Sequence, residues 1–260
     1  MKGRERAIRY ARGLLFAIVG FCAPFAAGGA QAQQNIGSTA LSQNQVSRDL
    51  AGAAGPLKSG DSVYRDEVVR TGEASLAKLV FLDSTNLAIG PISRVTLDRF
   101  VYAGATSAQE LTVNLAKGVF RFTTGALDKR AYTISTPTAS IGVRGTVLDI
   151  GVSSPQTRVT LVEGQALLCP RRPGITFEQQ RRNCARAERG AHCDCVELNN
   201  PGQTASAKKV GGAIQASLIS TPVNFASLCG GNAALCSDST YAMASPAGGG
   251  GFPSGALCGH

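Results

Sequence analysis

The sequence contains no tryptophan and only two histidines, and Asp, Glu, Lys and Arg together make up 17% of its 260 residues. His192 lies in a cysteine-rich stretch and His260 is the last residue, so neither stands beside a strand-to-helix turn that carries a nucleophile. A Ser-His-Asp or Cys-His arrangement would need one of them. The motifs G-x-S-x-G, H-E-x-x-H and G-x-x-x-x-G-K-[ST] are also absent. We therefore expect a protein that is not an enzyme and uses no cofactor.

Paired carboxylates are the remaining arrangement with catalytic potential. Glycoside hydrolysis needs two of them at a defined separation, and the candidates in the body are Asp83, Asp98, Asp149 and Glu163. Their spacing along the chain gives no reason to expect two of them together. Asp83 is interpreted as a turn residue that bonds its own backbone.

Charge and hydropathy exclude two further classes. The formal net charge is +9, but no block of Lys and Arg is interleaved with aromatic residues, and Arg171, Arg172, Arg181 and Arg182 fall in a loop-like insertion. This pattern indicates a solvated basic surface and no nucleic-acid partner. Beyond the amino terminus, no apolar run is long enough to span a membrane.

The amino terminus has the three parts of a secretory signal peptide. Residues 1–13 are basic, residues 14–27 are apolar, and Ala30-Gln31-Ala32 forms a small-x-small site, so we expect cleavage before Gln33. An uncleaved membrane anchor is disfavoured because the apolar run is short and contains Pro24. The mature protein is thus expected in the periplasm or outside the cell, without insertion in a membrane.

The body of the chain alternates short strand-like runs with turn residues. The apolar positions of these runs predict the core, which includes Leu79, Phe81, Val95, Leu97, Leu111, Val113, Leu115, Phe120, Phe122, Val159 and Leu161. No segment of the body has a sustained 3.6-residue stripe. The pattern predicts an all-β fold, as a jelly roll, a sandwich or a short β-solenoid.

The stretch Thr136–Thr146, TPTASIGVRGT, links strand-like runs on both sides, and Val143 keeps their period of two. Gly142 and Gly145 remove side chains where backbone approaches backbone or adopts a positive φ. Arg144 lies between these glycines, and its guanidinium is a planar fork of donors suited to carboxylates and carbonyls.

Further segments accompany this stretch: Gly60-Asp61, Val69-Arg70-Thr71-Gly72, VFLDSTNLAIGPISRVTLDRF at residues 80–100, Gly118-Val119-Phe120-Arg121 and Val162-Glu163-Gly164. Together with TPTASIGVRGT they resemble the FecR domain family. One departure is Ser84-Thr85, where the family commonly has Gly followed by Ser or Thr, and it bears on the type of turn there.

The resemblance implies a role in the cell envelope. FecR-like proteins are typically periplasmic sensor-regulators that relay a signal from an outer-membrane, TonB-dependent transducer to an extracytoplasmic-function sigma factor. They carry a cytoplasmic sigma-binding segment and a membrane helix, whereas only residues 1–13 precede the apolar run here. We therefore expect the periplasmic half to carry over: a β domain that contacts an envelope protein through strand edges or exposed loops.

Two interpretations stay open for the motif formed by Gly142, Val143, Arg144, Gly145 and Thr146. In the structural interpretation, the glycines allow close packing while Arg144 satisfies carbonyls or pairs with a carboxylate such as Asp98 or Asp149. In the functional interpretation, Arg144 recognises a partner protein.

Seven cysteines remain after the expected cleavage: Cys169, Cys184, Cys193, Cys195, Cys229, Cys236 and Cys258. Export would place them where disulfides form and persist, and the odd count leaves one free or intermolecular. If the strand-like runs 165–169 and 195–198 pair, Cys169 lies near Cys195 and Cys184 near Cys193, although Cys193 and Cys195 could exchange roles. Cys229 and Cys236 would close a short loop of their own.

A zinc site is the alternative for this region, with Cys184, Cys193, Cys195 and either Cys169 or His192 as ligands. The lack of a C-x-x-C pair and the expected export favour disulfides, so we expect no metal.

The expected boundaries are a signal peptide at 1–32, a linker at 33–59, a FecR-like β domain at 60–165, a cysteine-containing, loop-rich extension that continues the β domain at 166–236 and a flexible glycine-rich tail at 237–260. In the extension, Ala205, Val210, Ile214 and Leu218 are spaced for a marginal helix, which Gly211-Gly212 weakens.

The expected function is that of a non-enzymatic binding or scaffold module of the cell envelope, in signal sensing or regulation through contact with a protein. The alternative is a domain that binds carbohydrate or another envelope polymer on an aromatic platform drawn from Tyr64, Phe100, Tyr102 and Tyr132. A row of exposed rings would favour the glycan, and buried rings beside an open strand edge would favour the protein partner.

Overall fold

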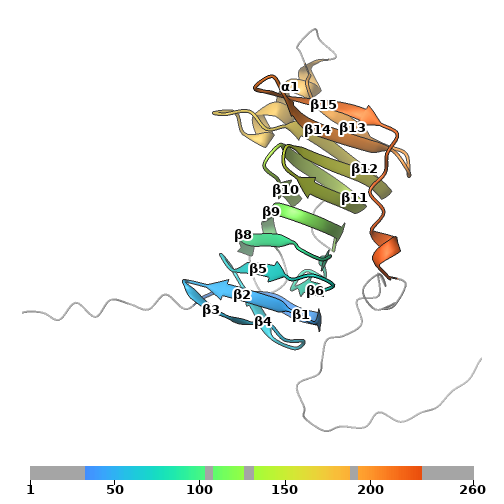
Figure 1. Cartoon of the computed structure of the whole chain (residues 1–260). Coiled ribbons are helices and arrows are strands. Elements are labelled where there is room, and N and C mark those ends of the chain that lie inside the picture. The colour runs from blue at the N-terminus through green and yellow to red at the C-terminus, as the bar shows by residue number, and fades with distance from the viewer. Residues whose placement is uncertain (1–32, 103–107, 126–131, 188–192, 230–260) are drawn as a thin grey trace, which may run out of the picture. The chain divides into compact units, whose positions relative to one another are not determined.

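A computed structural model describes residues 33–102, 108–125, 132–187 and 193–229 of the chain. The expected signal peptide and glycine-rich tail lie outside these residues. The elements in chain order are β1 (Asn35–Gln43), β2 (Val46–Leu50), β3 (Ala53–Pro56), β4 (Ser62–Tyr64), β5 (Val68–Thr71), β6 (Leu76–Phe81), β7 (Asn86–Ile89), β8 (Arg94–Tyr102), β9 (Ala108–Thr123), β10 (Tyr132–Ser135), β11 (Ala139–Ser153), β12 (Gln156–Pro170), α1 (Phe177–Ala187), β13 (Val196–Leu198), β14 (Thr204–Val210), β15 (Ala213–Ile219) and the 3₁₀ turn η1 (Phe225–Cys229) (Figure 1). The predicted all-β class is confirmed. None of the helices among the described residues has the length and apolar character needed to cross a bilayer.

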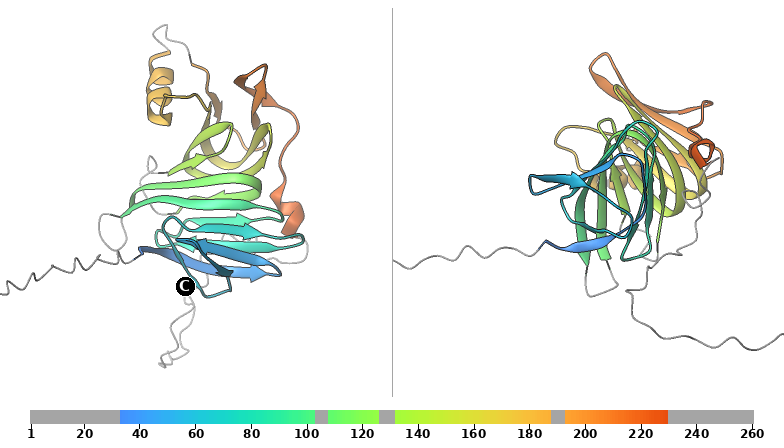
Figure 2. Two further views of the ribbon diagram at one scale, coloured as in Figure 1. Left: turned by 60° about the vertical axis from the view of Figure 1, so that its left-hand side comes forward. Right: turned by 60° about the horizontal axis from the view of Figure 1, so that its bottom comes forward.

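Hydrogen bonding joins the strands into one 15-stranded sheet that folds back on itself, with strands on both sides of the interior (Figure 2). The first layer runs β3-β2-β5-β8, the first half of β9, β10, the first half of β11, the second half of β12, and β13. The second layer runs β4-β1-β6-β7, the second halves of β9 and β11, the first half of β12, β14 and β15.

Three long strands therefore belong to both layers, and each changes layer at a glycine. Gly118 in β9, Gly145 in β11 and Gly164 in β12 have φ values of 118°, 57° and 84°, in the region that disfavours residues with a Cβ. The last two glycines pack together, because a Cβ on Gly164 would lie 1.9 Å from the carbonyl oxygen of Gly145. These bends bring the inward faces of both layers onto one core.

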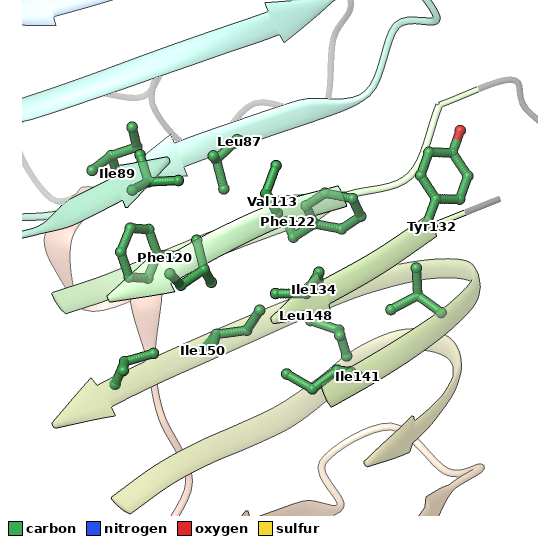
Figure 3. Close-up of a cluster of buried hydrophobic side chains, with 14 of the residues drawn as sticks. Leu87, Ile89, Val113, Phe120, Phe122, Tyr132, Ile134, Ile141, Leu148 and Ile150 are labelled. Carbon is green, nitrogen blue, oxygen red and sulfur yellow. The ribbon is translucent and has the colours of Figure 1, made fainter. Parts of the chain in front are cut away.

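The core consists of the alternating apolar positions that the sequence predicts. All eleven residues named above for the core are buried, and they join one cluster with Ile134, Ile141, Leu148 and Ile150. Figure 3 shows part of this cluster, contributed by β7, β9, β10 and β11. Phe122 and Tyr132 meet edge to face, with ring centroids 6.0 Å apart. Full burial of each large side chain contributes roughly 1.5–3 kcal/mol to folding.

Residues 33–59, expected as a linker, instead contain β1, β2 and β3. Their small polar residues obscure the strand pattern, yet β1 pairs with β6 and β2 pairs with β5. A buried ion pair also holds them: Arg48 Nη2 lies 2.7 Å from Glu67 Oε2, which also accepts a hydrogen bond from the N–H of Tyr64. Burial raises the pKa of Glu67 above its ordinary value, against the opposing effects of that N–H and of Arg48.

Asp83 forms the turn between β6 and β7, as predicted. Its carboxylate accepts hydrogen bonds from the N–H and hydroxyl of Thr85, and from the hydroxyl of Tyr132 at 2.8 Å. Ser84, between them in the chain, has a φ of 67°, a left-handed conformation that glycine adopts more easily. The departure from the family pattern at this position therefore leaves the turn intact.

The segment expected as a marginal helix near residue 210 forms the hairpin of β14 and β15 instead. Gly211 and Gly212 make its two-residue turn, with φ values of 56° and 87°. Ala205 and Ala207 alternate into the core, which is a period of two. The helix prediction was wrong because two adjacent glycines do more than weaken a helix: they favour the two-residue turn of a hairpin.

Residues 221–229, called here the C-terminal strap, cross the outer face of the second layer and end in η1 (Figure 1). Phe225 is completely buried there in a small cluster with Leu76 and Ala88. Its N–H donates to Asp149 Oδ2 at 2.9 Å, and Asp149 also accepts hydrogen bonds from Arg121 Nε at 2.7 Å and Nη2 at 3.0 Å. The Arg121 guanidinium lies 5.8 Å from the centroid of the Phe225 ring, within the range of a cation–π contact.

Candidate functional site

A groove lies on the outer face of the first layer, over the stretch that contains Arg144. Its floor crosses four strands in register, because Thr133 of β10 pairs with Gly142 of β11, Gly142 pairs with Leu167 of β12, and Leu167 pairs with Glu197 of β13. Arg144, paired with Gln165, forms the next row. Arg144 is exposed, whereas its neighbour Val143 points into the core.

Hydrogen bonds fix the backbone around Arg144. The hydroxyl of Thr146 accepts a hydrogen bond from the N–H of Arg144 at 2.9 Å and donates to the carbonyl of Gln165 at 2.7 Å. The N–H of Thr146 donates to the hydroxyl of Thr124 at 2.8 Å. Gly145 supplies the positive φ that the bend requires. The arginine is therefore carried on a backbone with little freedom to move.

The guanidinium of Arg144 has no hydrogen-bond or ion-pair partner among the residues that the structure describes. The carboxylates considered for it are engaged elsewhere: Asp149 is bound by Arg121 and Asp98 by the amide of Asn114. A pairing of Arg144 with either carboxylate is thus not found. Gly142 does allow close packing and Gly145 allows the bend, but the Arg144 guanidinium adds no hydrogen bond or ion pair to the described part of the fold.

Helix α1 forms the wall of the groove. Thr176 begins it with a capping box, in which the N–H of Gln179 donates to the Thr176 hydroxyl and the N–H of Thr176 donates to Gln179 Oε1. Phe177 lies over Gly142, where a Cβ would come 2.4 Å from the ring. Gln180 is buried and donates to the carbonyl of Pro170 at 2.8 Å. Because Gly142 has no side chain, the Phe177 ring can pack directly on the strand, and the helix lies close against the sheet.

Two disulfides hold the same region. Cys169 at the end of β12 is bonded to Cys195 beside β13, and Cys184 of α1 is bonded to Cys193. These are the two pairs expected from the pairing of the strand-like runs 165–169 and 195–198. Cys236 and Cys258 lie outside the described residues. The bonds tie α1 and β13 to the long strand β12, so the wall and the floor of the groove are covalently linked.

The sulfur atoms of Cys184, Cys193 and Cys195 lie within 4.8 Å of one another, a spacing that would suit a metal. Each of them is in a disulfide here, and zinc is bound by thiolates. His192 lies outside the described residues. The donor set therefore does not fit zinc in this oxidised form.

The groove has a volume of about 860 Å³ and is lined by polar and apolar side chains. Arg181 of α1 is neutralised by Glu178, with 2.7 Å between Nη2 and Oε1, and this hydrogen bond raises the pKa of the arginine further. Arg144 is the cation of the lining that has no such neighbour among the described residues. The groove can therefore take up an extended segment and offer it a charged hydrogen-bond donor, but it presents no nucleophile beside a base.

Of the four aromatic residues expected for a sugar platform, Phe100 and Tyr102 have side chains outside the described part of the structure, and Tyr64 and Tyr132 form no row of exposed rings. Tyr132 is buried against Phe122 and Asp83, and the ring of Tyr64 lies 5.6 Å from the guanidinium of Arg48. In the described part of the chain, the large apolar side chains that are exposed are all aliphatic: Leu82, Ile92, Val162, Ile175, Val210 and Leu218.

Comparison with known proteins identifies the domain. The family described as FecR protein matches residues 67–167, which confirms the resemblance seen in the sequence. The match includes β10, β11 and most of β12, which form most of the floor of the groove.

Among solved structures, the chain is similar to two crystal structures described as a candidate anti-sigma factor from Parabacteroides distasonis ATCC 8503. Both are 12% identical to it, with TM-scores of 0.40 and 0.39. Each comparison covers 58% of this chain and 59% of the solved one, so the chain spans less than two thirds of that protein. No match was found among curated proteins.

The sequence identifies the floor of the groove but not its wall. The insertion after Pro170 was expected as loop, and the helix that supplies Phe177, Glu178 and Arg181 was not predicted. Two local signals were present: the capping box from Thr176 to Gln179, and the Glu178–Arg181 pair three residues apart.

Proposed function

We propose that this chain is a non-enzymatic module of the cell envelope that takes part in signal regulation by binding another protein in the groove beside Arg144. The occupant is an extended segment of the partner that carries a carboxylate. Arg144 receives this carboxylate through the paired donors of its guanidinium.

One observation carries the proposal. Arg144 is an exposed cation on a rigid backbone, at the rim of a groove of about 860 Å³, with no carboxylate partner among the described residues. An arginine that stabilised the fold through its charge would be expected to have such a partner. A rigidly placed donor in a preformed groove loses less conformational freedom on binding, which favours recognition.

Location in the envelope is part of the proposal. The secretory pattern at residues 1–32 supports export, and disulfides such as those of Cys169 and Cys184 persist in oxidising compartments. The FecR domain supports a regulatory role rather than a catalytic one. Direct contact with a sigma factor is not part of the proposal.

The test is affinity capture from envelope extract with the wild-type protein, Arg144→Ala and Arg182→Ala as baits. Arg182 is a matched control, because it is an exposed arginine of α1 that does not line the groove. A protein retained by the wild type and by Arg182→Ala, and lost with Arg144→Ala, is then purified and titrated directly. We expect Arg144→Ala to weaken that binding by at least about tenfold, since a lost charged contact typically costs 1.5–3 kcal/mol.

Thermal unfolding of the same variants separates the two interpretations of the arginine. We expect Arg144→Ala to unfold within about 0.5 kcal/mol of the wild type, as exposed substitutions usually do. A large loss of stability, or equal retention of every bound protein by all three baits, would contradict the proposal.

A further inference from the structure

Four strands are paired on one side only among the described residues: β3, β4, β13 and β15. Three of them are protected against pairing with another chain. Strand β3 ends in Pro56, and β4 and β13 have three residues each. Strand β15, Ala213–Ile219, has seven residues and contains neither a charge nor a proline. Unprotected edges of this kind pair with other strands.

The backbone of β15 is set up for such pairing. The hairpin closes with the pair Val210–Ala213 around two glycines, so alternate residues from Ala213 onward bond to β14. The N–H and C=O groups of Ile214, Ala216 and Leu218 therefore point away from β14, where the described part of the chain offers them no strand.

The order of apolar and polar residues in β15, AIQASLI, is the same from either end of the strand. Antiparallel pairing of two copies about Ala216 matches Ile214 with Leu218, Gln215 with Ser217 and Ala213 with Ile219. Every pair is apolar with apolar or polar with polar, and the three residues with free backbone groups face one another. This register would form six backbone hydrogen bonds across the two-fold axis.

The side chains support the same register. Ile214 and Ala216 pack against the core at the end of the second layer, and Leu218 lies opposite the buried Ala205 yet is 55% exposed. In the paired arrangement, Ile214 of the second copy lies beside Leu218. The apolar inner face that ends at β15 would thus continue into the second copy.

We propose that β15 is a homodimerisation edge, through which two copies of this chain join their second layers into one continuous sheet with a two-fold axis at Ala216. The interface is isologous, since each copy presents the same strand. It lies on a different layer from the floor of the Arg144 groove, so the two proposals are tested independently.

The experiment measures self-association of the purified protein by sedimentation as a function of concentration. Gln215 and Ser217 are both exposed, and in this register each faces the other across the axis. The variant Q215E/S217E therefore places like charges opposite each other in two pairs, whereas Q215E/S217K places opposite charges there. We expect the first variant to weaken dimerisation about tenfold and the second to retain it.

Two controls complete the test. Ala54→Glu adds an acidic side chain at an exposed alanine of another edge strand and should leave association unchanged. Ala216→Pro removes an N–H that points away from β14 and should weaken the dimer while the hairpin stays intact. A monomeric wild type, or equal association of Q215E/S217E and Q215E/S217K when both unfold like the wild type, would overturn the proposal.

Discussion

The C-terminal strap is predicted to stabilise the domain mainly through Phe225. Its ring is fully buried against Leu76 and Ala88, with Leu41 and Val119 packed around it. Replacement by alanine removes this contact, and Phe→Ala changes in protein cores cost about 3–5 kcal/mol. The lower end applies here, because the strap lies on the outside of a sheet and can settle partly into the gap.

Phe225→Ala is therefore expected to reduce the free energy of unfolding by about 3 kcal/mol. A shift of about 2–4 °C per kcal/mol is typical for a domain of this size, which gives a fall in Tm of about 6–12 °C. Urea denaturation followed by circular dichroism measures the first quantity and calorimetry the second. Ile175→Ala is the control, since Ile175 is an apolar residue that is 42% exposed. If Phe225→Ala unfolded within about 0.5 kcal/mol of the wild type, the strap would not stabilise the fold as argued.

Three further predictions concern the body and its extension. Burial raises the pKa of Glu67, so the folded state binds the proton of this carboxyl more tightly than the unfolded state does. The free energy of unfolding of the wild type, relative to that of Glu67→Gln, should therefore fall as pH rises from about 4.5 through the raised pKa. Urea unfolding at several pH values measures this difference, and a difference that grew with pH would contradict the prediction. Tyr132→Phe removes the hydrogen bond to Asp83 and should cost about 1.5–3 kcal/mol in the same assay, whereas no change would mean that water replaces the hydroxyl without loss. Replacing Cys169 and Cys195 together by alanine should cost about 3.5 kcal/mol from the entropy of closing the loop, and equal stability would show that the other bond holds this region alone.

The alternation of apolar residues is sufficient to predict that the body is built of strands and which of its residues form the core, although it missed the strands of residues 35–56 and 204–219. Phe120 and Phe122, for example, are two residues apart and both are buried, because a pleated strand sends alternate side chains to one face. The turn at Asp83 is also local, since its carboxylate bonds a residue two positions along the chain. Such features need no knowledge of the rest of the fold.

The contacts that define the outer faces could not be derived in this way. Phe225 donates to a carboxylate 76 residues earlier, and no periodicity marks that partner. Likewise, Arg144 is closer than Arg121 to Asp149 in the sequence, yet Arg121 binds the carboxylate because the pairing of β9 with β11 places it opposite Asp149. The groove beside Arg144 has the same origin, because its wall comes from an insertion whose position depends on two disulfides.

The three strands that cross between the layers at Gly118, Gly145 and Gly164 have a mechanical consequence. Neither layer can move relative to the other unless these strands lose their backbone hydrogen bonds to the neighbouring strands on both sides. A partner that pulls on the domain would therefore move it as one rigid piece, without opening it like a hinge. A signal passed on by this protein would then consist of a change in the position of the domain or in its binding partner, while the conformation of the domain would stay the same.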